Sequence, residues 1–189
     1  MKIAVVGAGN IGRTLGGKWV AAGHEVVYGV RSPEAAGAAT ISDAVAGAEV
    51  VLLAVPGPAA KDVLATLGDE LAGKVVIDAT NDMQGAGKLH ALDELADGAH
   101  PVRAFNTLGW ENYADPVFDG VKADLFYAAE EGHAKHVADA LIADVGLEPV
   151  WLGGVETFDI VDSLTRLWFQ LTFQRKLGRR LAFKMLLGT

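Results

Sequence analysis

The 189-residue sequence contains no cysteine. This absence excludes disulfide bonds, thiolate catalysis and cysteine-ligated metal sites. No stretch approaches the roughly 20 apolar residues that a membrane helix needs, and no signal peptide precedes the first apolar run, which begins at residue 3. We therefore expect a cytoplasmic protein without a membrane-spanning segment.

Acidic residues are missing from the last part of the chain. Residues 163–189 contain six Lys and Arg but no Asp or Glu, although the whole chain has a formal net charge of −8. That net charge, without interleaved basic and aromatic residues, argues against nucleic-acid binding. Apolar residues recur in this tail at largely helical spacing, which fits core packing, a dimer interface or the wall of a ligand pocket. They are Leu164, Leu167, Trp168, Leu171, Leu177, Leu181 and Met185. We expect a homodimer through this tail, with its cations beside the partner's acids or an anionic ligand.

Glycine is abundant at the start of the chain. An apolar run at residues 2–6 leads directly into Gly7-Ala8-Gly9-Asn10-Ile11-Gly12, a G-x-G-x-x-G motif, and then into an amphipathic helix and a second strand. In this setting Gly7 permits a tight turn, Gly9 lets the backbone approach a pyrophosphate, and Gly12 lets the helix pack closely on the strand. The motif therefore predicts dinucleotide binding at the start of that helix, through Asn10 and Ile11 as well as the glycines.

The choice of dinucleotide depends on the end of the second strand. An NAD site usually has an Asp or Glu there to bind the ribose 2′-hydroxyl, but this chain has Arg31-Ser32. A guanidinium and a hydroxyl can bind a 2′-phosphate through charge-assisted hydrogen bonds. Glu34 lies beyond a proline and is expected to point to solvent. The pattern favours NADP(H), although Arg31 could also be an ordinary solvated loop cation.

Strands and helices alternate along the rest of the chain. Strand-like runs at 49–55, 74–79 and 101–105 are separated by expected helices at 42–46, 59–67 and 88–95. After residue 107 we expect a strand at 123–129, a helix at 134–145, a short strand at 148–152 and a long terminal helix from about residue 158, with a possible break at Gly178. This order predicts an α/β, Rossmann-like, doubly wound parallel sheet at 1–107 and a small α+β unit at 108–189, which would complete an acceptor pocket.

Ligands of such sheets bind beyond the carboxyl ends of the strands. The loops at these ends are therefore expected to meet the nicotinamide, although Asn, Thr and Pro are common in any loop. The loop residues concerned are Val55, Pro56, Thr80, Asn81, Phe105, Asn106 and Thr107.

Histidine, the commonest general base, is poorly placed. His24 precedes the second strand, His90 and His100 flank expected elements, and His133 and His136 open a surface helix. None is positioned as a general base, and the last pair lacks a nearby third ligand for a metal. We expect no metal site.

Four segments of the sequence resemble the NADPH-dependent reductases of the deazaflavin coenzyme F420. They are the glycine motif, Gly-Val-Arg-Ser at 29–32, Val-Arg-Ala-Phe-Asn-Thr at 102–107 and Val-Asp-Ser-Leu-Thr-Arg at 161–166. The chain is also similar to the oxidoreductase portion of the six-transmembrane metalloreductases. The resemblance implies direct hydride exchange between NADPH and the deazaflavin, without a catalytic side chain. Two alternatives stay open, namely reduction of a flavin, or of iron through a flavin, and a non-catalytic NADP sensor or assembly subunit.

Overall fold

A computed structural model describes residues 1–33, 38–84 and 87–188. Its centre is an eight-stranded sheet in the order β10-β9-β6-β5-β4-β1-β2-β3. The strands are β1 (Lys2–Val6), β2 (Glu25–Gly29), β3 (Ala38–Ala39), β4 (Val50–Leu53), β5 (Val75–Asp78), β6 (His100–Arg103), β9 (Asp124–Ala129) and β10 (Glu148–Trp151). The six strands from β3 to β6 are parallel, β9 is antiparallel to β6, and β10 is parallel to β9.

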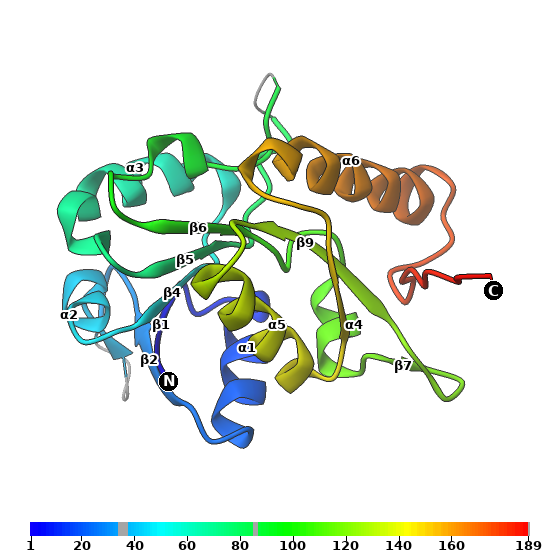
Figure 1. Cartoon of the computed structure of the whole chain (residues 1–189), viewed down its shortest axis with the longest axis horizontal. Helices are drawn as coiled ribbons and strands as arrows, with labels where there is room; N and C mark the ends of the chain where they lie inside the picture. The colour runs from blue at the N-terminus through cyan, green and yellow to red at the C-terminus, as the bar shows by residue number, and fades with distance from the viewer. Residues whose placement is uncertain (34–37, 85–86, 189) are drawn as a thin grey trace.

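Helices cover both faces of the sheet, as Figure 1 shows. On one face lie α1 (Asn10–Ala21), α4 (Trp110–Ala114) and α5 (His133–Val145), and on the other lie α2 (Ile41–Ala46), α3 (Gly57–Leu67) and α6 (Phe158–Phe169). Alternate residues of a strand face different layers: Ile3 and Val5 pack with α1, whereas Ala4 and Val6 pack with α2 and α3. The predicted doubly wound α/β fold is confirmed.

The strand order changes direction beside β1. The chain passes from β1 to β2 on one side and later places β4 on the other side. In open parallel sheets the crevice for a ligand forms at such a switch point, beyond the carboxyl ends of the strands. Here that position lies between the turn after β1 and the segment after β4.

The segment after residue 107 extends the same sheet. β9 and β10 are joined to it through β6, while β7 (Val117–Phe118) and β8 (Val121–Lys122) form a small separate hairpin. Short 3₁₀ turns occur at η1 (Gly68–Leu71), η2 (Leu92–Glu94) and η3 (Val155–Thr157). The division of the chain at residue 107 stays a prediction.

Two expected helices differ from the structure. The helix expected at 88–95 is wrong, because only η2 forms there. The backbone N–H groups of Leu89 and Ala91 donate instead to the carboxylates of Asp162 and Asp78, which holds this segment in another path.

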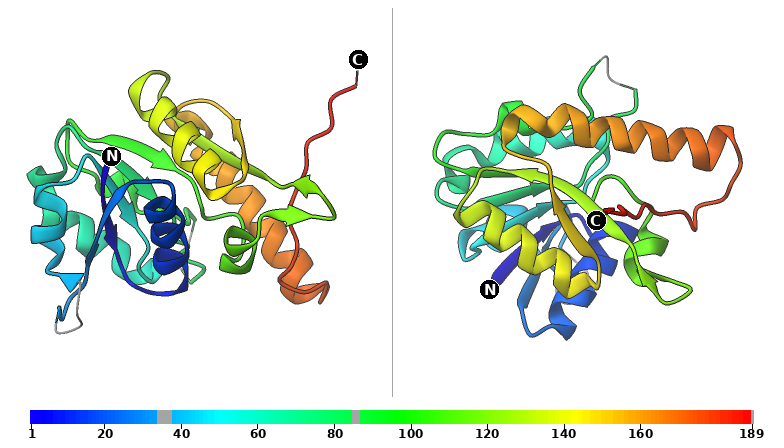
Figure 2. Two further views of the ribbon diagram at one scale, coloured as in Figure 1. Left: turned by 90° about the horizontal axis from the view of Figure 1, so that it is seen from below. Right: turned by 45° about the vertical axis from the view of Figure 1, so that its right-hand side comes forward.

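The terminal helix begins at Phe158 as expected but ends earlier than the tail does. α6 continues into one π-helical turn, η4 (Gln170–Gln174), and residues 175–188 contain no further helix. Lys176 has a φ of 57° and Gly178 a φ of 90°, which turns the chain back toward β9 (Figure 2). There the Asp124 N–H donates to the Phe183 carbonyl oxygen at 2.9 Å.

Candidate functional site

The glycine turn joins β1 to α1 in close contact with β4. Gly7 has a φ of 106°, and a Cβ there would collide with the carbonyl oxygen of Ala54. A Cβ at Gly12 would collide with the carbonyl oxygen of Gly7, so this position also requires glycine. A Cβ at Gly9 would meet no atom within 4 Å. Two of the glycines therefore permit packing, and the third borders open space.

The start of α1 is available to an anion. Its N-cap is Gly9, no side chain caps it, and no acidic residue lies in its first turn. The free N–H groups and the helix dipole both favour negative charge at such a terminus. A phosphate placed beside Gly9 would meet them directly.

A cavity of about 430 Å³ extends from this turn past the end of β2. It is lined by Gly7, Ala8, Gly9, Gly29, Val30, Arg31, Ser32, Ile41, Ala54, Val55, Pro56, Ala59 and Val63. Arg31 is exposed and has no ion-pair partner among the described residues. Glu34, expected to point to solvent, lies outside the described residues.

A second cavity, of about 400 Å³, adjoins the first and shares Gly9, Ala54, Val55 and Pro56 with it. Its other lining residues are Asn10, Ile11, Asn81, Asn106, Leu108, Gly109, Trp110, Trp168, Phe169 and Arg179. Three of these are aromatic and one is a cation. The second cavity therefore suits a planar ring with a negative charge at one end.

Four of the predicted binding residues line neither cavity. Gly12 packs beneath the turn, and Thr80, Phe105 and Thr107 are buried. The Phe105 ring packs edge to face against Trp19 in the core, with centroids 5.7 Å apart. Phe105 also has a φ of 60°, a left-handed conformation that is rare for a bulky residue and that marks this loop as strained.

Beneath the second cavity lies a buried charged network that sequence reasoning missed. The Arg103 side chain is fully buried together with those of Asp78 and Asp162. Its Nε donates to Asp162 Oδ1 at 2.8 Å, and its Nη1 donates to the carbonyl oxygens of Asp78 and Thr80. Asp78 and Arg103 are paired in register on neighbouring strands, which is the one signal that could have indicated the contact.

The C-terminal tail is held by ion pairs within the chain. Arg179 pairs with Glu111, Arg180 with Asp115, and Lys184 with Asp124. Hydrogen bonding from Arg179 lowers the pKa of Glu111. The Arg179 guanidinium also lies 5.6 Å from the centroid of the Trp168 ring, at the second cavity. All three cations therefore have partners in their own chain, and Arg179 also lines the second cavity. Their expected contact with a ligand or a neighbouring subunit stays a prediction.

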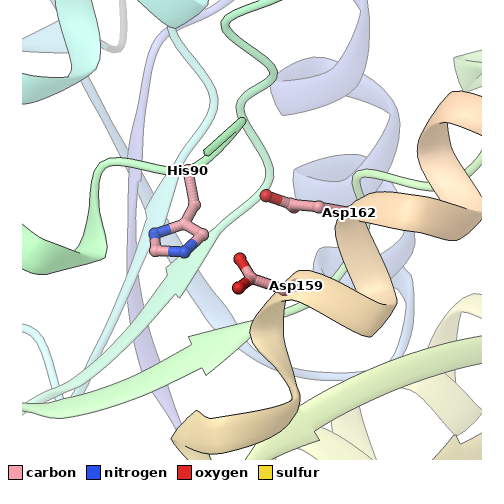
Figure 3. A group of neighbouring side chains, drawn as sticks. All are labelled: His90, Asp159 and Asp162. Carbon is pink, nitrogen blue, oxygen red and sulfur yellow. The ribbon is translucent and has the colours of Figure 1, made fainter. Parts of the chain in front are cut away.

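A group of potential metal ligands occurs apart from both cavities, although none was expected. Donor atoms of His90, Asp159 and Asp162 lie within 4.8 Å of one another, with His90 directed toward the two carboxylates of α6 (Figure 3). However, His90 Nδ1 accepts a hydrogen bond from the Leu92 N–H, which places the proton of a neutral ring on the nitrogen nearer the carboxylates. Asp162 is already bound by Arg103. This donor set favours a neutral histidine over a bound cation, and burial lowers the pKa of His90 accordingly.

No histidine of the described residues lines either cavity. His24 lies at the opposite end of the sheet, where its Nε2 contacts Asp144 Oδ2 at 2.8 Å. Within the described residues, no helix is both long and apolar enough to cross a membrane.

Comparisons with known proteins indicate which enzymes the chain resembles. Residues 2–82 match the family model of the coenzyme F420-dependent NADP oxidoreductases. The F420-dependent NADP reductase of Methanothermobacter thermautotrophicus is 29% identical, covering 93% of this chain and 91% of that protein. The metalloreductase STEAP3 of Rattus norvegicus is 27% identical over 86% of this chain but only 36% of its own length.

Among solved structures, one from Arthrobacter sp. FB24, provisionally named an F420-dependent NADP-reductase, superposes with a TM-score of 0.85. It is 26% identical, and the match covers 98% of this chain and 99% of that one. The resemblance in the sequence is confirmed, and the chain is similar along nearly its whole length to proteins named as F420-dependent NADP reductases.

Proposed function

We propose that the protein is an NADP(H)-dependent oxidoreductase that transfers a hydride between NADPH and a deazaflavin of the F420 type. The observation that carries this proposal is the pair of adjoining cavities that meet at Gly9, Val55 and Pro56. One cavity has the chemistry of a dinucleotide site and the other has aromatic walls. Relatives named as F420-dependent NADP reductases support the same assignment.

The first cavity would hold the nucleotide. Gly9 and the start of α1 would bind the pyrophosphate, and Arg31 with Ser32 would bind the 2′-phosphate. The open space beside Gly9 fits a group that approaches the backbone closely. The nicotinamide would then lie near Val55 and Pro56, where the cavities meet.

The second cavity would hold the acceptor. Trp110, Trp168 and Phe169 would contact a planar ring, and Arg179 would lie near an anionic extension. When bound, the two cofactors supply the redox chemistry. The protein would orient them and exclude water. No acid or base is needed for such a transfer, in keeping with cavities that no histidine lines within the described residues.

The acceptor can be tested by following NADPH oxidation with F420, FMN and FAD in parallel, and by measuring NADPH binding by calorimetry. We expect turnover with the deazaflavin and little with either flavin. Turnover with FMN or FAD would favour a flavin reductase, and iron reduction that requires an added flavin would favour a ferric reductase. The similarity to the metalloreductase STEAP3 supports this alternative. Tight NADPH binding without turnover would instead indicate a sensor or assembly subunit.

We also propose a homodimer formed through α6. Ile160, Leu164, Leu167 and Leu171 follow one another at helical spacing, and Ile160 and Leu167 are 54% and 45% exposed. Leu167→Glu should convert a sedimenting dimer into a monomer, whereas Val20→Glu, at an exposed apolar position on α1, should not. A monomeric wild type would refute the proposal. A cytoplasmic location stays a prediction.

A further inference from the structure

Two asparagines that line the second cavity are linked by hydrogen bonds to side chains of α6, Asn106 directly and Asn81 through Arg103. We propose that this helix sets the orientation of the nicotinamide, with Asp162, Arg103 and Thr165 as positioning residues that act through Asn81 and Asn106. This inference rests on the proposed function, because it assumes that NADPH occupies the site. None of the three positioning residues lines either cavity.

The first branch determines how the Asn81 amide points. Asn81 Oδ1 accepts a hydrogen bond from Arg103 Nη2 at 3.0 Å, and its Nδ2 donates to the Asn106 carbonyl oxygen at 2.8 Å. A guanidinium can only donate and a carbonyl can only accept, so these partners settle the amide orientation. Each end of the amide keeps one further hydrogen-bonding position. A carboxamide such as that of nicotinamide has the matching donor and acceptor.

Arg103 is itself fixed by α6. Asp162, on this helix, accepts from Arg103 Nε at 2.8 Å and lies 2.7 Å from Nη2. The two carbonyl oxygens of Asp78 and Thr80 accept from Nη1. Four hydrogen bonds and ion pairs with two buried carboxylates therefore hold the guanidinium in one orientation. Asp162 therefore reaches Asn81 through Arg103.

The second branch starts one turn further along α6. Asn106 Nδ2 donates to Thr165 Oγ1 at 2.8 Å, and both residues are buried. One turn beyond Thr165, Trp168 lines the second cavity. The same helix therefore supports both asparagines and forms part of the acceptor wall. A shift of α6 would move the two subsites together.

The decisive variant is Thr165→Val, which keeps the shape of the side chain and removes the hydroxyl that holds Asn106. Thr165→Ser should rescue it, because serine restores the hydroxyl. Thr172→Val is the matched control: Thr172 is also buried and lies just beyond α6, but its hydroxyl has no hydrogen-bond partner. Asp162→Asn tests the other branch, and its melting temperature is measured alongside.

Three readouts separate positioning from folding and from overall affinity. The first is the fluorescence emission of bound NADPH, which reports how rigidly the reduced nicotinamide is held. The second is a pair of dissociation constants, for NADPH and for 2′-phospho-ADP-ribose, a fragment that lacks nicotinamide. The third is the single-turnover rate of hydride transfer. For Thr165→Val we expect altered emission and transfer about tenfold to hundredfold slower, because small misplacements of reacting groups have effects of this size. Affinity for 2′-phospho-ADP-ribose should be unchanged.

The inference is overturned if Thr165→Val behaves like Thr172→Val in emission and rate, or if the fragment loses affinity as much as NADPH does. Its failure can be told apart from failure of the proposed function. The emission and binding measurements need no acceptor, so they decide the role of α6 even if the deazaflavin is not turned over. Absence of deazaflavin turnover by the wild type would refute only the proposed acceptor.

Discussion

Removing the Arg31 side chain should change which dinucleotide the protein prefers. Arg31 lines the first cavity beside Ser32, and within the described residues its guanidinium has no carboxylate partner that would compete with a ligand. The 2′-phosphate distinguishes NADPH from NADH. We therefore expect Arg31→Ala to weaken binding of NADPH much more than binding of NADH.

The size of the effect follows from the chemistry and the exposure of the site. A hydrogen bond to a charged group contributes about 1.5 to 3 kcal/mol, which corresponds to roughly tenfold to 150-fold in affinity. Arg31 is exposed, so solvent and salt screen its charge and the lower end applies. We expect the preference for NADPH to fall about tenfold. Arg31→Lys should retain part of it, because lysine keeps the charge but not the planar fork.

Calorimetric titration of each variant with both dinucleotides, at low and high salt, measures this directly. The NADPH affinity of the wild type should decrease with salt more steeply than its NADH affinity, and Arg31→Ala should remove most of that difference. Equal weakening of both dinucleotides in Arg31→Ala would show that Arg31 does not contact the 2′-phosphate. A wild type that binds both equally would refute the NADP(H) assignment itself.

Two further predictions separate folding from binding elsewhere. Gly9→Val should keep a normal melting temperature but lose NADPH binding in calorimetry, because its side chain enters the open space beside the turn. Gly12→Ala should instead lower the melting temperature, because its Cβ collides with the Gly7 carbonyl oxygen. Wild-type NADPH affinity in Gly9→Val would show that the turn is purely structural. For His90, burial lowers the pKa in the folded state below the usual 6.5, so the unfolded chain binds the proton first and stability should decrease as the pH falls through about 6.5. His90→Asn supplies an amide oxygen that can accept from the Leu92 N–H, and its side chain cannot titrate in this range. In denaturant titrations this variant should lose less stability than the wild type between pH 7.5 and 5.5. An identical pH profile for both proteins would contradict the lowered pKa of His90.

The parts of the fold that sequence predicted well depend on local patterns. The glycine turn, the buried strands and most helices follow from residues close together in the chain, such as the apolar run at 2–6 and the glycines after it. The helix wrongly expected at 88–95 shows the limit of this reasoning. Its backbone donors are taken by Asp78 and Asp162, and Asp162 lies 73 positions from Leu89. Local propensity contains no information about such partners.

The lining of the two cavities was predicted in part for the same reason. Strand ends can be located from sequence, so the loops holding Asn81 and Asn106 were expected to meet a ligand, and both residues line the second cavity. The aromatic wall was less accessible. Trp168 belongs to an apolar stripe that fits core, dimer interface or pocket wall equally well, and the choice depends on where α6 packs.

One face of α6 explains why polar residues lie inside the protein at all. Asp162, Thr165 and Trp168 follow at intervals of three, and all three are buried. A buried carboxylate or hydroxyl is costly unless it is hydrogen-bonded, so an apolar face would be the simpler way to pack this helix. Instead, Thr165 binds Asn106, and Asp162 binds Arg103, which in turn binds Asn81. Each polar group therefore supports a loop of the second cavity, one directly and one through Arg103. We therefore infer that the polar residues of this face fix the geometry of the loops around the second cavity. The aromatic residue at its end forms part of the wall of that cavity.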